Sequence, residues 1–195
     1  MSEARIRGGG DIPTQSTDAC FAGVRTLALS TQPADGVAVE LGAWLGAMTA
    51  AIAAANPELE VHAFDRFVVR DPRELGKAAR QGGKLKMLQD LLPMVRASLA
   101  KYPRVHLHQG EIHRARWTGQ PIALQVDDAC KQPASFAAAL RIFSPSWVAR
   151  RTHVVLLDYY YPPAKCQRAW VQAHSSQLEQ VSEYPAAFLY LGGRV

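Results

Sequence analysis

The segment 37–49 constrains the fold most, because a short apolar run gives way to glycine and then to a helix-forming stretch. The run Val37–Leu41 is typical of a buried strand, and Gly42 and Gly46 follow it before an alanine-rich segment that ends at Ala55. This order predicts a strand, a tight turn and a helix N-terminus in quick succession. Such a turn exposes bare backbone and unpaired N–H groups that a ligand can approach.

A second apolar run, 59–64, ends in Asp65 roughly 20 residues after the glycine turn. A nucleotide-binding βαβ unit places an acidic residue at this spacing, where it binds the ribose. The chain has no GxxxxGK[ST] loop, which argues against an NTPase, and no Gly-x-Ser-x-Gly elbow for nucleophilic catalysis. The two segments together therefore predict a nucleotide-cofactor site.

Helical and strand patterns alternate along the chain, which predicts an α/β fold with a Rossmann-like, doubly wound and mostly parallel sheet. The two last strands are separated only by Tyr184-Pro185, too short a link for a helical crossover, so they should form a C-terminal antiparallel hairpin. The expected strands are 37–41, 59–64, 104–108, 121–126, 152–157, 178–183 and 186–191, and the expected helices are 20–31, 45–55, 84–102, 135–143 and 164–175.

Two segments carry weaker patterns. We expect residues 66–83, with mixed charge and adjacent glycines, to form a long mobile loop that acts as a lid. Pro93 either kinks the helix expected over 84–102 or starts a second one. At the N-terminus, residues 1–18 are rich in glycine and small polar residues, so we expect a disordered or loosely packed segment followed by a single domain over 19–195.

Charge and cysteine content restrict the function classes. The formal charge of +5 comes from scattered Lys and Arg, and the densest group, 77–86, is interpreted as a solvated face rather than a phosphate-binding patch. We therefore expect no nucleic-acid partner. Cys20, Cys130 and Cys166 form no CxxC pair, which favours a reduced, cytoplasmic compartment. No apolar stretch approaches the ~20 residues that span a bilayer, so no membrane association is expected.

Acidic and polar side chains recur where the predicted parallel strands end. Ligands in open α/β sheets bind beyond these carboxyl ends, so the recurrence marks a candidate site. In a strand that is buried on both faces, an unpaired charge is energetically unfavourable, so charged residues at the strand ends suggest a role outside the core. In chain order, the candidates are Glu40, Gly42, Ala43, Gly46, Asp65, Arg66, Gly110, Glu111, Asp127, Asp128, Lys131, Asp158, Tyr159 and Tyr160.

The histidines give a separate, weaker signal. His106 and His108 alternate on one face of a predicted strand, and two such histidines can bind zinc. No second pair of soft ligands follows at metal spacing, so we interpret both as polar strand residues. His62 lies inside a strand and is expected to be a partnered core histidine.

From about Gly36 to the C-terminus, the order of segments resembles class I S-adenosylmethionine (SAM)-dependent methyltransferases. The run 39–46 resembles the family's glycine motif, Asp65 stands at the ribose-binding acid, and Gly110-Glu111 resembles the motif near the adenine. Residues 121–131 and 154–161 resemble the fourth- and fifth-strand motifs. The chain is most similar to the small branch of macrocin O-methyltransferases and cephalosporin-hydroxylase-like proteins. The resemblance implies the strand order 3-2-1-4-5-7-6.

The resemblance also implies roles for the candidates. The cofactor would be SAM, bound by Glu40, Gly42, Ala43, Gly46, Asp65, Arg66, Gly110, Glu111 and Asp127. For a small hydroxylated acceptor, our own hypothesis makes Asp128, Lys131 and Asp158 the catalytic residues, with Tyr159 and Tyr160 shaping the acceptor pocket. Lys131 would stabilise the developing alkoxide or phenolate, and Asp158 would orient it.

The chain departs from the family pattern in ways that leave alternatives open. Trp44 replaces the middle glycine, and either Asp127 or Asp128 takes the first acidic place of the fourth-strand motif. A divalent metal is doubtful, because only Asp128 and Asp158 are placed to hold Mg²⁺. A non-catalytic SAM-fold scaffold and a hydroxylase-like protein on the same fold are the alternative functions. The aromatic C-terminal hairpin and Trp170 suggest a homodimer surface.

Overall fold

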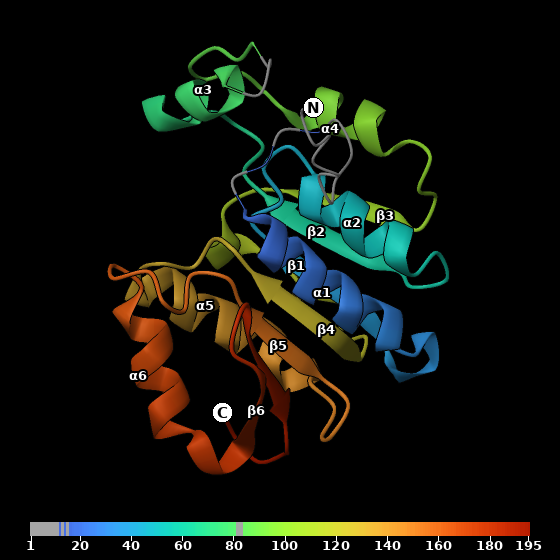
Figure 1. The fold of residues 1–195 in the computed structure, drawn as a ribbon, viewed down its shortest axis with the longest axis vertical. Helices are drawn as coiled ribbons and strands as arrows, with labels where there is room; N and C mark the ends of the chain where they lie inside the picture. The colour runs from blue at the N-terminus through green and yellow to red at the C-terminus, as the bar shows by residue number, and fades with distance from the viewer. Residues whose placement is uncertain (1–11, 13, 15, 81–83) are drawn as a thin grey trace, which may run out of the picture.

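Seven strands form one sheet in the order β3-β2-β1-β4-β5-β7-β6 (Figure 1). The computed structural model describes residues 12, 14, 16–80 and 84–195. Strands β1 to β5 run parallel, and β7 pairs antiparallel with both β5 and β6, as predicted. The strands are β1 (Val37–Leu41), β2 (Val61–Asp65), β3 (Val105–Gln109), β4 (Ile122–Asp127), β5 (His153–Leu156), β6 (Leu178–Ser182) and β7 (Ala186–Tyr190).

Helices cover both faces of the sheet (Figure 1). One face carries α1 (Asp18–Ser30), α2 (Ala47–Ala55) and α4 (Leu92–Leu99), and the other carries α5 (Pro133–Phe143) and α6 (Lys165–Ala173). Helix α3 (Pro72–Ala79) projects beyond the carboxyl ends of the strands. Among the described residues there are also four short 3-10 turns, η1 (Pro33–Asp35), η2 (Ile112–Arg114), η3 (Ser144–Ser146) and η4 (Ser175–Gln177).

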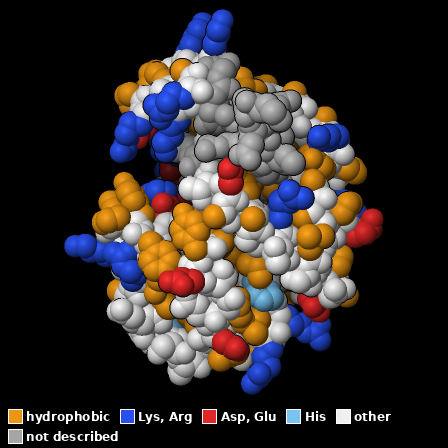
Figure 2. Space-filling model, in the orientation of Figure 1, with side chains coloured by type: hydrophobic (Ala, Val, Ile, Leu, Met, Phe, Trp, Pro, Cys, Tyr) orange, Lys and Arg blue, Asp and Glu red, His pale blue; other side chains and the backbone are white. Residues whose placement is uncertain are grey.

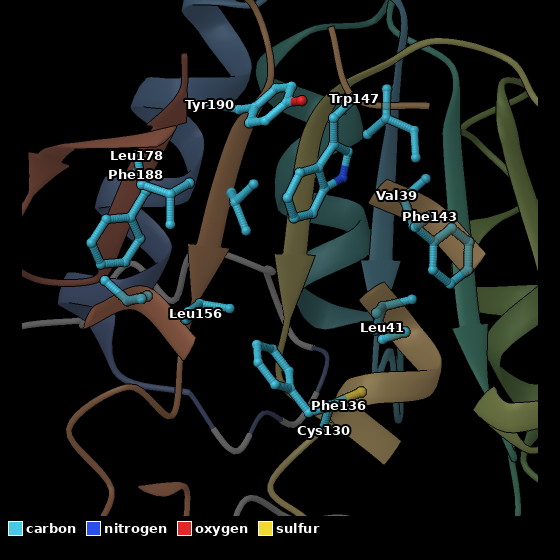
Figure 3. Packing of buried hydrophobic residues seen from close by; sticks show 14 of the residues in the cluster. Val39, Leu41, Cys130, Phe136, Phe143, Trp147, Leu156, Leu178, Phe188 and Tyr190 are labelled. Atoms are coloured by element: carbon cyan, nitrogen blue, oxygen red, sulfur yellow. The ribbon is translucent and has the colours of Figure 1, made fainter. Parts of the chain in front are cut away.

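Apolar packing on the α5 side holds the central strands in place (Figure 3). Leu41 of β1 and Leu156 of β5 pack with Phe136 and Phe143 of α5, and Trp147 fills the opposite end of the same cluster. Every residue of β1 and β4 is buried. Neighbouring layers enclose both faces of these two strands. Polar groups that follow them can therefore reach solvent only beyond the C-terminal ends of the strands.

The expected loop over 66–83 contains a helix, so that expectation was wrong. Helix α3 begins after Asp71, whose side chain accepts a hydrogen bond from the backbone N–H of Arg73 at 2.9 Å. Pro72 occupies the first turn and Glu74 follows it. An N-cap aspartate, an early proline and an acidic residue in the first turn are all helix-start signals. Residues 81–83 lie outside the described part of the chain.

The helix expected over 84–102 is much shorter, because only Leu92–Leu99 is helical. Pro93 lies in the first turn, so it starts a helix and does not kink one. The preceding residues pair with another loop instead: the N–H of Leu91 donates to the carbonyl of Phe67 at 2.6 Å, and Val68 forms a bridge with Asp90. This tertiary pairing replaces the local helix that the leucine spacing predicts.

The N-terminal prediction for 1–18 falls mainly on residues outside the described ones. Helix α1 begins at Asp18, and the Thr17 hydroxyl caps it by accepting from the N–H of Cys20. In the described part of the chain, no helix has the length and apolar character needed to cross a bilayer. The three cysteines are unpaired thiols. Trp170 packs inward against Phe136 and Trp147, and the homodimer stays a prediction.

Candidate functional site

A cleft of about 1220 Å³ opens at the carboxyl ends of β1 to β5, between the loops that follow these strands and helix α3. Figure 2 shows acidic and basic side chains close together at the hollow beside the region of α3. Ten of the fourteen candidate residues line the cleft: Glu40, Gly42, Ala43, Asp65, Arg66, Gly110, Glu111, Asp128, Lys131 and Asp158. The sheet topology therefore gathers residues that lie as much as 118 positions apart (Glu40 to Asp158).

The turn after β1 depends on Gly42. Its φ of +96° lies in the left-handed region, where glycine is favoured. A Cβ atom there would lie 3.0 Å from the Cβ of Ala129 and 3.0 Å from the carbonyl carbon of Asp128. The loops after β1 and β4 thus approach each other so closely that position 42 has no room for a side chain. Residues of both loops line the cleft.

Asp65, the last residue of β2, ties the glycine turn to the loop after β2. Its Oδ2 accepts the N–H of Trp44 at 3.0 Å, and its Oδ1 accepts the N–H of Phe67 at 2.6 Å. Burial raises the pKa of Asp65, while these N–H donors and the charge of Arg66 oppose the shift. The carboxylate is thus held in a fixed position on the cleft wall.

Glu40 is a buried carboxyl group at the end of β1, with 1% of its surface exposed. The Thr49 hydroxyl of α2 donates to its Oε2 at 2.5 Å. The pKa of Glu40 is raised to about 8, chiefly by burial; the Thr49 hydrogen bond opposes the shift, and the nearby charges of Asp128 and Asp65 add to it. A cationic ligand in the cleft would relieve this penalty by favouring the ionised form.

The loops after β4 and β5 form a second charged group, in which Lys131 lies between two carboxylates. Its Nζ contacts Oδ2 of Asp158, donates to the carbonyl of Asp128 at 2.9 Å, and lies 3.6 Å from Oδ1 of Asp128. Ser16 donates to Oδ2 of Asp128 at 3.1 Å. Burial raises the pKa of Asp128 to about 7, with Lys131 opposing and Asp158 adding to the shift. The two carboxylates raise the pKa of Lys131, although its burial acts to lower it.

This arrangement does not suit a divalent metal held by Asp128 and Asp158. The ammonium of Lys131 already occupies the space between the two carboxylates. A hard divalent cation there would need further oxygen ligands and would face the lysine charge at close range. We therefore assign no metal to the cleft.

Four candidates lie outside the cleft lining. Asp127 turns its Oδ1 to the backbone N–H groups of Ala129 and Cys130, at 3.0 and 2.8 Å. Gly46 faces α4, where a Cβ would come within 2.9 Å of Leu99. Tyr159 packs against Phe188, and Tyr160 is exposed.

Several residues that line the cleft were not among the candidates predicted from the sequence. Ser16 comes from the segment expected to be loose, and Arg73 and Glu74 come from helix α3. His108 and Tyr161 complete the wall. The helix-start signal Asp71-Pro72 could have revealed the α3 contribution, whereas Ser16 carries no local signal, because only the tertiary fold brings it to Asp128.

No protein-family model and no curated protein sequence matches the chain. Solved structures do share its fold. The O-methyltransferase NovP is similar over 92% of this chain and 83% of its own length, with a TM-score of 0.67 and 16% identity. A Staphylococcus aureus protein assigned as a caffeoyl-CoA O-methyltransferase matches over 93% and 87%, with a TM-score of 0.58 and 11% identity.

A TehB-like SAM-dependent methyltransferase from Corynebacterium glutamicum matches over 86% of this chain and 87% of its own, with a TM-score of 0.54 and 11% identity. At these identities the similarity establishes the fold. The chain has the Rossmann-like fold of the class I SAM-dependent methyltransferases, with the strand order 3-2-1-4-5-7-6.

Proposed function

We propose that the protein is a SAM-dependent methyltransferase that O-methylates a small hydroxylated acceptor. The observation that carries the proposal is the cleft itself, in which a left-handed glycine turn, the buried carboxyl group of Glu40 and the partly buried carboxyl group of Asp65 meet at the carboxyl ends of the strands of a methyltransferase fold. Ligands in open α/β sheets bind at this place.

The charges at the β1–β2 end of the cleft suit SAM. Glu40 is buried and Asp65 is partly buried, and desolvation raises the pKa of both carboxyl groups. SAM carries a sulfonium and an ammonium group, and a nearby cation favours the ionised form of a carboxyl group. We assign Asp65 to the ribose, Glu40 to the cationic methionine part, and Gly110 and Glu111 to the adenine. The cleft volume of about 1220 Å³ exceeds the roughly 300–1000 Å³ of most ligand sites, which leaves room for an acceptor.

The β4–β5 end of the cleft suits the acceptor hydroxyl. Bound SAM supplies an activated methyl group, so the chain must mainly align the acceptor and manage its proton. Lys131 presents an ammonium that stabilises developing negative charge on the acceptor oxygen. Asp128, whose pKa is about 7, is suited to take the hydroxyl proton near neutral pH. Asp158 holds Lys131 in place through their ion pair.

The cofactor assignment can be tested by titrating the untagged protein with S-adenosylhomocysteine (SAH) and, separately, NAD⁺ in a calorimeter. We expect saturable SAH binding and none of NAD⁺. Asp65→Asn removes the charge that faces the ribose, so it should weaken SAH binding by about 1.5–3 kcal/mol, or roughly 10- to 150-fold. Glu58→Gln removes an exposed carboxylate outside the cleft lining and serves as the matched control.

Unchanged SAH affinity in Asp65→Asn would contradict the ribose assignment, and absence of SAH binding would contradict the function. Activity is then measured with methyl-labelled SAM and a panel of phenolic and sugar hydroxyl acceptors. SAH binding without turnover on any acceptor would favour the non-catalytic scaffold. A hydroxylase would need a metal site, which the lysine-filled space between Asp128 and Asp158 does not supply.

A further inference from the structure

Three metal-ligating side chains gather on the sheet outside the catalytic cleft. Glu60 directly precedes β2, His62 lies in β2, and His106 lies at the neighbouring position of the edge strand β3. Glu60 and His62 are two positions apart and therefore project to the same face of the sheet. Among the described residues, this is the one group of three such side chains whose ligand atoms lie close enough for one ion, all within 4.8 Å of one another.

The three groups converge on one carboxylate oxygen. Oε1 of Glu60 lies 2.9 Å from Nε2 of His106 and 3.2 Å from Nε2 of His62. The two imidazole rings stack, with centroids 4.8 Å apart and an interplanar angle of 21°. Both Nε2 atoms therefore face the same anionic group from adjacent strands.

His62 places its Nε2 atom in a buried position beside this carboxylate. The residue is 7% exposed, and within the described part of the chain Nε2 makes no well-aligned hydrogen bond, only the 3.2 Å contact with Oε1 of Glu60. Buried polar atoms in native proteins are normally fully partnered, and an ion bound between Nε2 and Oε1 would supply that partner.

The other ring nitrogen of His62 is already engaged. Nδ1 lies 3.0 Å from Nε2 of His108, which fixes the ring's orientation, and Trp117 packs edge-on against the same ring. A hydrogen bond to the second nitrogen and an apolar surround are the features that support metal-binding histidines in known sites. His62 is thus held as a ligand would be.

We propose that Glu60, His62 and His106 bind a zinc-like divalent transition-metal ion. Two imidazole nitrogens and one carboxylate oxygen form a His₂Glu donor set, which proteins use for Zn²⁺ with a fourth position left to water. The half-exposed His106 and the partly exposed Glu60 give the ion a path from solvent. The site is separate from Asp128 and Asp158 and does not depend on the methyltransferase proposal.

The metal site would also adjoin the cleft. His108, which contacts His62, lines the cleft wall and stacks on Phe64 with ring centroids 4.3 Å apart. Metal binding at Nε2 of His62 would therefore order a histidine that faces the cofactor cleft. We infer a structural role for the ion at the edge of the sheet, where β3 is the outermost strand in the part of the chain that the structure describes.

The test titrates the untagged, metal-free full-length chain with Zn²⁺ by competition against a chromogenic chelator, and with Co²⁺ by visible absorption. We expect one equivalent of Zn²⁺ per chain and the intense Co²⁺ bands of a four-coordinate site. His106→Ala should weaken Zn²⁺ binding by more than about tenfold, because second-shell changes alone cost that much. His113→Ala removes another exposed histidine and should leave the affinity unchanged.

Glu60→Gln provides a second variant that keeps the side-chain size. It should also weaken Zn²⁺ binding by more than about tenfold, since an amide is a poor zinc ligand. Circular dichroism establishes that each variant folds. The proposal fails if the wild type binds no stoichiometric Zn²⁺, or if His106→Ala and Glu60→Gln bind as tightly as His113→Ala. SAH binding is measured in parallel, so failure here is distinguishable from failure of the proposed function.

Discussion

The two ends of the cleft contain carboxyl groups in opposite electrostatic situations. At the β1–β2 end, burial raises the pKa of Glu40, and the charges of Asp128 and Asp65 add to the shift. At the β4–β5 end, Asp128 and Asp158 share the built-in ammonium of Lys131. A bound cation would stabilise the ionised form of Glu40 at the first end, whereas Lys131 already provides a cation at the second end. This difference supports placing the cationic cofactor at the first end and the acceptor hydroxyl at the second.

Lys131→Ala tests the separation of the two ends and should have the largest effect. Loss of the ammonium should lower methyl transfer by about 10²- to 10⁴-fold, the usual contribution of a group that assists proton or charge transfer. SAH affinity should stay within about twofold of the wild type, as measured by calorimetry. Lys165→Ala, an exposed lysine on α6, is the control. An equal loss of SAH affinity would show that the two ends do not act separately.

Glu40→Gln tests the buried carboxyl group at the β1–β2 end through the pH dependence of stability. The pKa of Glu40 is about 8 in the folded state against about 4.5 when unfolded, so the folded state holds the proton more tightly. This stabilisation is complete below pH 4.5 and is lost as the pH rises through 8. Between pH 5 and pH 9 the loss is on the order of 4 kcal/mol, at 1.36 kcal/mol per pKa unit.

The variant should therefore lose less stability than the wild type over this range in urea unfolding. Glutamine keeps an oxygen that can accept from Thr49, so the local hydrogen bond can survive. Asp128 also has a raised pKa, which leaves part of the slope in place. Glu58→Gln should reproduce the wild-type curve. A Glu40→Gln slope equal to that of the wild type would show that Glu40 is ionised when folded.

Gly42→Ala should have the smallest effect and tests whether the close approach of the β1 and β4 loops holds the two ends together. The added Cβ would lie 3.0 Å from the Cβ of Ala129 and from the carbonyl carbon of Asp128. The φ of +96° at position 42 is also strained for alanine. We expect a loss of about 1–3 kcal/mol in the free energy of unfolding. Gly76→Ala, in the middle of α3 with only Arg80 nearby at 3.6 Å, should be neutral or slightly stabilising. Equal stability of both variants would contradict a tight loop contact.

Local patterns predicted the central sheet well and its periphery poorly. Strand β1 spans 37–41 as expected, because a β-branched run enclosed on both faces has no competing structure. The leucines of 84–91 have helical spacing, yet this segment is not helical. Leu91 is buried and donates its N–H to the carbonyl of Phe67, while Leu88 is exposed. Leucine spacing predicts a helix only where the folded chain offers a surface for that helix to pack against. Cytoplasmic localisation and the macrocin-like branch stay predictions.

The amino-acid sequence by itself determined the order of the strands and of the helices other than α3, and it placed a carboxylate near the end of each strand from β1 to β5. Only the tertiary structure decided which of them meet. Asp128 faces the cleft, while its neighbour Asp127 caps the local backbone, and no pattern along the chain distinguishes the two. Likewise, Glu60 and His62 meet His106 only through the register between β2 and β3. Strand pairing joins residues far apart in sequence, so local periodicity cannot show such contacts.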